Sequence, residues 1–199
     1  MHLVRALGEL LDHLRAEGRQ VVGIAARHET LIGHDLLVHH VGARVAQVGA
    51  NARVEDPAGN EGSGLGPWSF KFERGDDGDR FKLDEVMGSD ALLLGRKTYE
   101  GFAAAWPGRT DEAGFADKFN SMPKYVISAT LEDSIQLVQT LMEHDLIDEY
   151  RLMTFPVVLG KGRRLFGEGS PTTTLQLADS QAVGPVGVLV LTYQRATDS

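Results

Sequence analysis

A short apolar segment followed at once by a helix pattern constrains the fold of this chain more than any other feature. Residues Ala91–Leu94 can form a fully buried strand, and this strand pattern ends at Gly95. A polar-headed, helix-compatible segment begins immediately afterwards and runs to about Phe102. Such a junction is typical of α/β proteins, in which helices cover a sheet. We therefore predict a buried strand and a following helix here.

The same junction carries residues that suit an anionic ligand. The N-terminus of a helix directs backbone N–H groups and the positive end of the helix dipole at one point. Gly95 allows a ligand to approach the backbone closely, while Arg96, Lys97 and the Thr98 hydroxyl add donors for a phosphate. An ordinary β–α junction with solvated basic side chains explains the same residues without any ligand. Both interpretations stay open on spacing alone.

Strand and helix patterns continue to alternate along the rest of the chain. Asp76 or Asp77 is expected to cap a helix that runs toward Met87, and a helix is expected over residues 111–122. Asp133 or Ser134 is expected to cap the next one. These patterns predict an α/β domain with a mixed sheet. Its further strands are expected at Tyr125–Ser128, Ile147–Met153, around Leu175–Leu177, and at Val188–Tyr193 after a turn at Gly184–Gly187.

The N-terminal part of the chain differs from this pattern. Leucines at helical spacing over Leu3–Arg15 predict an amphipathic helix, and Val21–Ala25 a short strand. Residues 51–66 are polar and rich in glycine, which is typical of a linker. We therefore expect an N-terminal extension over 1–50, a linker over 51–66 and the main domain over 67–199.

Composition excludes several classes of function. The net charge of −8 argues against a general nucleic-acid binder, and the absence of cysteine rules out disulfides and thiolate chemistry. No apolar run approaches the roughly 20 residues that span a bilayer, and the N-terminus does not read as a signal peptide. We expect a cytoplasmic protein without a membrane segment. Four histidines between positions 28 and 40 match no zinc signature, so no metal site is predicted: His28, His34, His39 and His40.

Three motifs together resemble one known family. They are GRKTYEGF from Gly95, PKYVISATL from Pro123 and the segment Asp148–Gly162, and they occur in that family's order. The resemblance is to the dihydrofolate reductase-like family, in particular to the reductase domain of the bifunctional riboflavin-biosynthesis deaminase-reductases. It extends from about Trp68 to Tyr193. It implies a three-layer sandwich with a central mixed sheet, here with one strand missing and with an N-terminal helical extension.

The resemblance also implies a reductase that uses NADPH. In the family, the turn that matches Gly95, Arg96, Lys97 and Thr98 contacts the cofactor phosphates, and the strand end that matches Ser128 lies near the adenosine part. The nicotinamide itself supplies the hydride, so the protein mainly has to hold it against the substrate and no catalytic residue is assigned. The implied substrate is a pteridine- or ribosylaminopyrimidine-like heterocycle.

Two departures from the family pattern keep an alternative open. Relatives carry a Ser-Leu-Asp-Gly-like motif where this chain has Ala50–Arg53. Relatives also insert a strand and a glycine-rich turn for the pyrophosphate where Glu132–Ile135 bridges directly here. The alternative is a non-catalytic remnant of the fold that acts as a binding or dimerisation module.

A homodimer is expected in either case. Tyr150, Leu152 and Phe155 lie in a strand-like segment, and the helix at Leu3–Leu14 adds a second apolar surface. Uncovered apolar surface commonly becomes a subunit contact.

Overall fold

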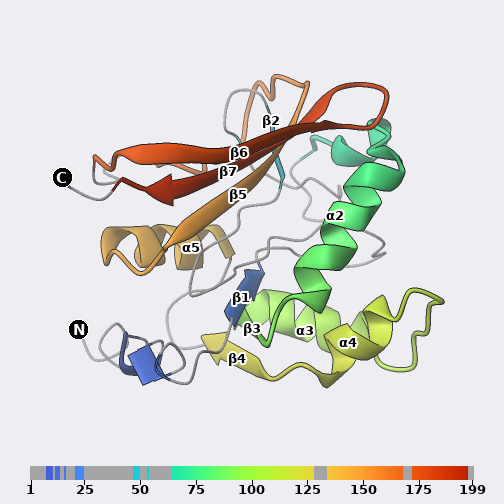
Figure 1. Cartoon of the computed structure of the whole chain (residues 1–199), viewed down its shortest axis with the longest axis vertical. Coiled ribbons are helices and arrows are strands. Elements are labelled where there is room, and N and C mark those ends of the chain that lie inside the picture. The colour runs from blue at the N-terminus through green and yellow to red at the C-terminus, as the bar shows by residue number, and fades with distance from the viewer. Residues whose placement is uncertain are drawn as a thin grey trace.

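A computed structural model of the chain confirms the α/β fold class (Figure 1). The structure describes residues 8–10, 12, 13, 16, 21–24, 47–49, 53, 64–127, 134–167 and 172–196. Its strands are β1 (Val21–Ile24), β2 (Gln47–Gly49), β3 (Ala91–Gly95), β4 (Lys124–Ile127), β5 (Glu149–Phe155), β6 (Leu175–Val183) and β7 (Val188–Arg195). Its helices are η1 (Ser69–Lys71, 3-10), α2 (Gly75–Met87), α3 (Arg96–Ala105), α4 (Phe115–Ser121) and α5 (Ser134–Glu143).

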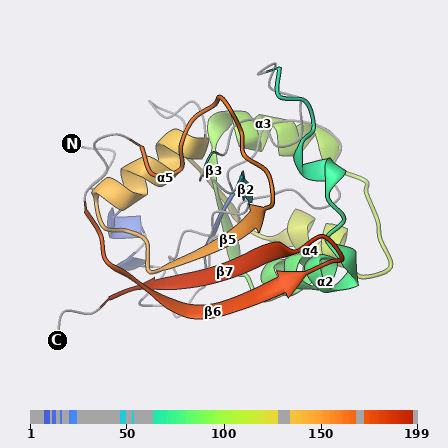
Figure 2. The same ribbon diagram turned by 90° about the horizontal axis from the view of Figure 1, so that it is seen from above.

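The described strands pair in two sheets, whereas one central sheet was expected. The first sheet has the order β1-β3-β4 with parallel neighbours. The second has the order β2-β5-β7-β6, in which β2 is parallel to β5 and the other neighbours are antiparallel (Figure 2). Each sheet therefore receives one strand from the first 50 residues. The expected division of the chain into segments 1–50, 51–66 and 67–199 stays a proposal. The strand pairings join the first of these segments to the last.

The predicted strand at Ala91–Leu94 lies at the centre of a helix–sheet–helix sandwich. All five residues of β3 are buried, and β3 lies between β1 and β4 in its sheet. Ala91 and Leu93 pack in a cluster with α5, while Leu92 and Leu94 pack in another with α3 and α4. Successive side chains of a strand point to opposite faces, so helices cover both faces of β3. This explains why its sequence is continuously apolar rather than alternating.

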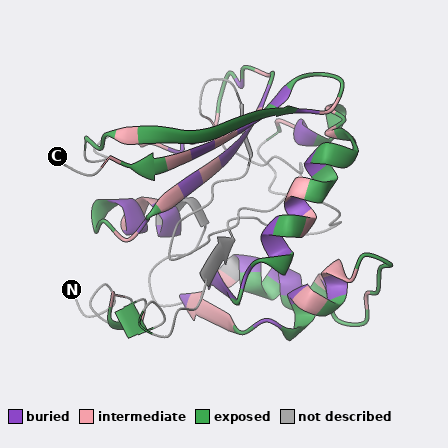
Figure 3. Ribbon diagram, viewed as in Figure 1, coloured by how far each residue is buried: buried purple, intermediate pink, exposed green. Residues whose placement is uncertain are grey.

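The second sheet encloses its own cluster and holds α2. Met153 and Phe155 of β5 pack with Val190 of β7 and with Trp68, whose ring meets Phe155 edge-on at 5.6 Å. Most of β6 is exposed, in contrast to β5 (Figure 3). The buried carboxylate of Glu85 on α2 accepts a hydrogen bond from Arg151 of β5 at 3.0 Å. This ion pair attaches α2 to the sheet.

Two predicted helix starts are wrong in detail. Neither Asp76 nor Asp77 caps α2, because the capping position falls on Arg74; both lie in the first turn, where their charge complements the helix dipole. The helix expected over residues 111–122 begins only at Phe115. The Asp111 carboxylate instead accepts hydrogen bonds from the Phe115 and Ala116 backbone N–H groups, which lower its pKa against the opposing effect of burial.

Other expectations are confirmed or lie outside the described residues. Residues 184–187 form the turn between β6 and β7. Those residues of the N-terminal helix that are described are helical, namely 8–10, 12, 13 and 16. The expected cap Asp133 and the four clustered histidines lie outside the described residues.

The apolar side chains expected at a dimer contact are part of the core. Tyr150, Leu152 and Phe155 are only 3%, 7% and 0% exposed. They are covered because Tyr150 and Leu152 pack in the cluster that contains α5, and Phe155 packs in the cluster that contains Trp68. They therefore offer no surface for a second subunit.

Burial of Tyr150 predicts a loss of stability in alkaline solution. Burial raises the pKa of its phenol to about 12, with Asp145 adding to the rise and Arg195 opposing it. The unfolded chain releases this proton near pH 10, so the stabilisation is complete below that pH and is lost as the pH rises toward 12. We expect ionisation of this phenol to lower the free energy of unfolding by about 2 kcal/mol over this pH range. Urea unfolding of the native chain and of Tyr150→Phe should diverge in this window, and parallel pH profiles would contradict the prediction.

Candidate functional site

Three parallel strands end together at one edge of the first sheet. Ile24 at the end of β1 is paired with Leu94, and Gly95 at the end of β3 is paired with Ile127 at the end of β4. In open α/β sheets, ligands bind in the crevice beyond the carboxyl ends of the strands. The junction singled out in the sequence therefore occupies the middle of such an edge.

Gly95 and Thr98 are held firmly at this edge. Gly95 ends β3 and is the capping residue of α3, and α3 begins at Arg96 without a side-chain cap. Its φ of −71° is an ordinary extended conformation, so the backbone itself does not require glycine here. Thr98, in the first turn of α3, is only 1% exposed. The first amides of α3 thus point to the edge without a capping side chain in front of them.

Arg96 lies at the surface beside this helix N-terminus. Its guanidinium donates a hydrogen bond to the Glu100 carboxylate at 3.1 Å, one helical turn away, and both side chains are largely exposed. Exposed pairs of this kind contribute only about 0.3–0.5 kcal/mol. An anion at the helix N-terminus could therefore draw Arg96 away from Glu100 at little cost.

The structure does not describe the side chains of the other two predicted cofactor residues, Lys97 and Ser128. Lys97 belongs to α3, but its side chain lies outside the described part of the structure. Ser128 directly follows β4 and lies outside the described residues altogether. Their assignment to the cofactor stays a prediction.

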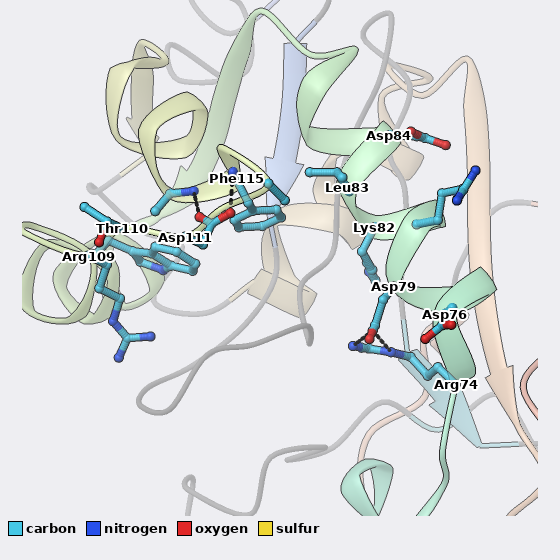
Figure 4. A pocket seen from close by; sticks show the side chains of 14 residues that line it. Arg74, Asp76, Asp79, Lys82, Leu83, Asp84, Arg109, Thr110, Asp111 and Phe115 are labelled. Atoms are coloured by element: carbon cyan, nitrogen blue, oxygen red, sulfur yellow. Dashed lines mark hydrogen bonds and ion pairs between the residues drawn. The ribbon is translucent and has the colours of Figure 1, made fainter.

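A cavity of about 660 Å³ opens elsewhere, between α2 and the segment 106–116 (Figure 4). Its apolar surface comes from Leu83, Trp106, Ala113, Phe115 and Ala116. None of Gly95–Thr98 lines it. This cavity was not predicted from the sequence, because it depends on how α2 packs against α4.

Charged side chains of both signs surround the apolar surface of the cavity. Two of the carboxylates already have partners: Asp79 is paired with Arg74 at 2.5 Å, and Asp111 binds the α4 backbone. In Figure 4 the charged residues of α2 lie on one side of the view, and Arg109, Thr110 and Asp111 lie on the other. The cations that line it are Arg74, Arg80, Lys82 and Arg109, and the carboxylates are Asp76, Asp79, Asp84 and Asp111.

Among the described residues, no group of three or more histidine or acidic side chains could hold a metal ion. No described helix combines the length and apolar character needed to cross a membrane.

The chain has a dihydrofolate reductase-like α/β fold, as the resemblance of the three motifs implies. Residues 131–189 match the family model described as the RibD C-terminal domain. This segment includes α5, β5, β6 and the start of β7, and it begins well after the Gly95 junction, which it does not include. No curated protein sequence is significantly similar to this chain.

One of three similar solved structures supports the same fold. A protein from Shewanella sp. PV-4, described as a putative riboflavin biosynthesis protein, has a TM-score of 0.53 at 20% identity and covers 76% of this chain and 97% of its own. A pyrimidine reductase-like protein from Corynebacterium diphtheriae has a TM-score of 0.37 at 16% identity, with 80% and 79% covered. The riboflavin biosynthesis reductase Rib7 of Saccharomyces cerevisiae has a TM-score of 0.37 at 12% identity, with 76% and 86% covered.

Proposed function

We propose that this chain is an NADPH-dependent reductase that acts on a ribosylaminopyrimidine- or pteridine-like heterocycle. The observation that carries the proposal is the match of residues 131–189 to the RibD C-terminal domain, in a chain whose fold is of the same kind. The Gly95 junction adds support, since it combines a helix N-terminus with a cation at the carboxyl edge of a parallel sheet.

The residues of this chain would act by holding the cofactor. The backbone amides at the start of α3 would donate hydrogen bonds to a phosphate, and Arg96 and Lys97 would balance its charge. Ser128 would lie beside the adenosine part of the cofactor. NADPH supplies the hydride when it is bound. The protein therefore acts mainly by holding the cofactor in position against the substrate. Correct positioning of the reactants accounts for much of the rate acceleration by an enzyme.

Replacing Arg96 and Lys97 together with alanine should weaken NADPH binding by at least about tenfold, because hydrogen bonds to charged groups contribute roughly 1.5–3 kcal/mol. Titration followed by NADPH fluorescence measures this. The control is Lys161→Ala/Arg195→Ala, which removes the same charge from exposed positions outside α3. Equal affinities in the two double variants would remove Gly95–Thr98 from the cofactor site.

A second candidate function is a binding or dimerisation module without turnover. The observation that favours it is Arg53, which stands where relatives carry the aspartate–glycine motif. Its guanidinium donates a hydrogen bond to the Gly162 carbonyl, and its backbone pairs with that of Arg164. In this chain the segment that replaces the family's motif is thus tied to the loop after β5 by the Arg53 side chain.

Turnover separates the two candidates. We expect NADPH oxidation to be slow compared with an intact relative, because the aspartate–glycine motif is replaced and misplacement of a hydride donor strongly reduces rate. A panel of pteridine and ribosylaminopyrimidine substrates, run beside that relative, tests this. Turnover equal to the relative's would mean that other residues compensate for Arg53. The homodimer, to be checked by light scattering, and the cytoplasmic location remain further predictions.

A further inference from the structure

The first strand of the chain belongs to the sheet that carries the Gly95 junction. β1 pairs with β3 in parallel over four positions, from Val21 with Ala91 to Ile24 with Leu94 (Figure 1). Leu10, in the helical segment that precedes β1, packs against the cluster that contains Ala91 and Leu93. The N-terminal segment therefore contributes both a strand and apolar packing to the same domain.

The connection between β4 and α5 is too short to hold a further strand of this sheet. β4 ends at Ile127 and α5 begins at Ser134, which leaves the six positions 128–133. A strand that runs parallel to its neighbour needs a crossover of about a dozen residues or more. In the family that the three motifs resemble, a strand that ends in a pyrophosphate-binding turn is inserted at this point. Any such strand of this chain must come from elsewhere in the sequence.

The surroundings of Gly95 indicate which strand that is. Gly95 ends β3, which has β4 on one side and β1 on the other, and all three strands are parallel. Neighbouring strands are about 4.8 Å apart, which is comparable to the span of a diphosphate group. The end of β4 leads directly to Ser128, the position expected at the adenosine part of the cofactor. β1 is therefore the strand that can share a diphosphate with the Gly95 junction.

The path of the chain also favours a ligand between β1 and β3. After β3 the chain continues through α3 to β4, whereas the next described strand after β1 is β2 of the second sheet. In open α/β sheets, ligands bind where the connections from two neighbouring strands diverge. The flanking helices lie on opposite faces: α3 packs with Leu92 and Leu94, and Leu10 packs with Ala91 and Leu93. The point of divergence in this sheet is between β1 and β3.

We propose that β1 takes the place of the strand that relatives insert between β4 and α5, so that a diphosphate binds across the carboxyl ends of β1 and β3. The proposal rests on the proposed function, and it concerns how this chain builds the cofactor site rather than which compound it reduces. Residues 1–24 are then a part of that site encoded at a different position in the sequence. The short bridge at Glu132–Ile135 is then no sign of a lost function.

Moving the segment within the chain tests this replacement. In the relocated variant the chain begins at residue 25 after an initiating methionine, and residues 1–24 are inserted between Asp133 and Ser134. This variant should unfold cooperatively and bind NADPH with the affinity of the native chain. The matched control carries the same residues in scrambled order at the same place. It should bind NADPH at least about tenfold more weakly, because it loses hydrogen bonds to a charged group.

A spin label directly after β1 tests where the diphosphate lies in the full chain. The sequence contains no cysteine, so Ala25→Cys creates a single attachment site. The label should broaden the diphosphate signals of bound NADP⁺ in phosphorus NMR spectra, and likewise the signal of inorganic pyrophosphate. The control label is attached at Gln176→Cys, an exposed position on β6 of the second sheet, and should leave these signals sharp. Thermal unfolding checks that both labelled chains are folded.

Two results would overturn the proposal while leaving the reductase in place. One is NADP⁺ binding without broadening by the label at residue 25. The other is a relocated variant that folds but binds NADPH as weakly as the scrambled control; if the relocated variant does not fold, the label decides.

Failure of the proposed function gives a different pattern. If NADP⁺ does not bind but pyrophosphate binds and is broadened by the label at residue 25, the reductase is rejected and the diphosphate site stands. If neither compound binds, both proposals are rejected.

Discussion

Removing residues 1–50 is expected to abolish cooperative unfolding of this chain. The deletion takes away β1, which pairs over four positions with β3, and β2, which pairs over three positions with β5. Each backbone hydrogen bond contributes about 0.5–1.5 kcal/mol net, so the summed loss is comparable to the 5–15 kcal/mol that stabilises a typical domain. Circular dichroism during heating should show a broad change without a transition.

The matched control is a deletion of residues 1–7, which leaves both strands in place. It should keep a sharp transition close to that of the full chain. If residues 51–199 alone unfold as sharply as the full chain, then residues 1–50 are a separable extension and the strand pairings contribute little.

Glu85→Ala is expected to destabilise the chain by about 2–4 kcal/mol, because removing one partner of a buried ion pair leaves the other charge poorly compensated. The Glu85 side chain is 2% exposed and the Arg151 side chain is 27% exposed. Arg151 keeps a second partner, Glu149 at 2.7 Å, which limits the loss. Urea unfolding measures the effect.

Two comparisons isolate the ion pair from simple loss of packing. Glu85→Gln keeps the shape and one acceptor, and it should cost clearly less than the alanine variant. Glu149→Ala removes the more exposed partner of Arg151 and should have the smaller effect of the two alanine variants. If Glu85→Gln costs as much as Glu85→Ala, the charge is essential; if Glu85→Ala is nearly neutral, the pair does not hold α2 in place.

Local features of the fold could be predicted from the sequence. Ala91–Leu94 is continuously apolar because helices cover both faces of β3, and Gly184–Gly187 carries the turn residues of a hairpin. The arrangement of the strands could not be predicted. Residues 21–24 pair with β3, which is far away in the sequence. The sequences of short strands such as β1 and β2 do not indicate which strands they pair with.

The candidate sites divide in the same way. Gly95 and Arg96 were found because a strand end and a helix start are adjacent in sequence. The cavity was missed because its walls, α2 and the segment after Trp106, are brought together only by packing. A tryptophan in a Trp-Pro-Gly segment was the available signal, but nothing in the sequence shows that its N–H has no acceptor among the described residues.

The pairing of early strands with late ones also affects how this chain folds during synthesis. Gln47 pairs with Met153, so β2 cannot be completed until β5 has been made. At about 5–20 residues per second, the interval is on the order of 5–20 s. During that time β2 has no partner strand. Native contacts of such long sequence separation slow folding, so chaperone capture of the nascent chain should be concentrated in this interval.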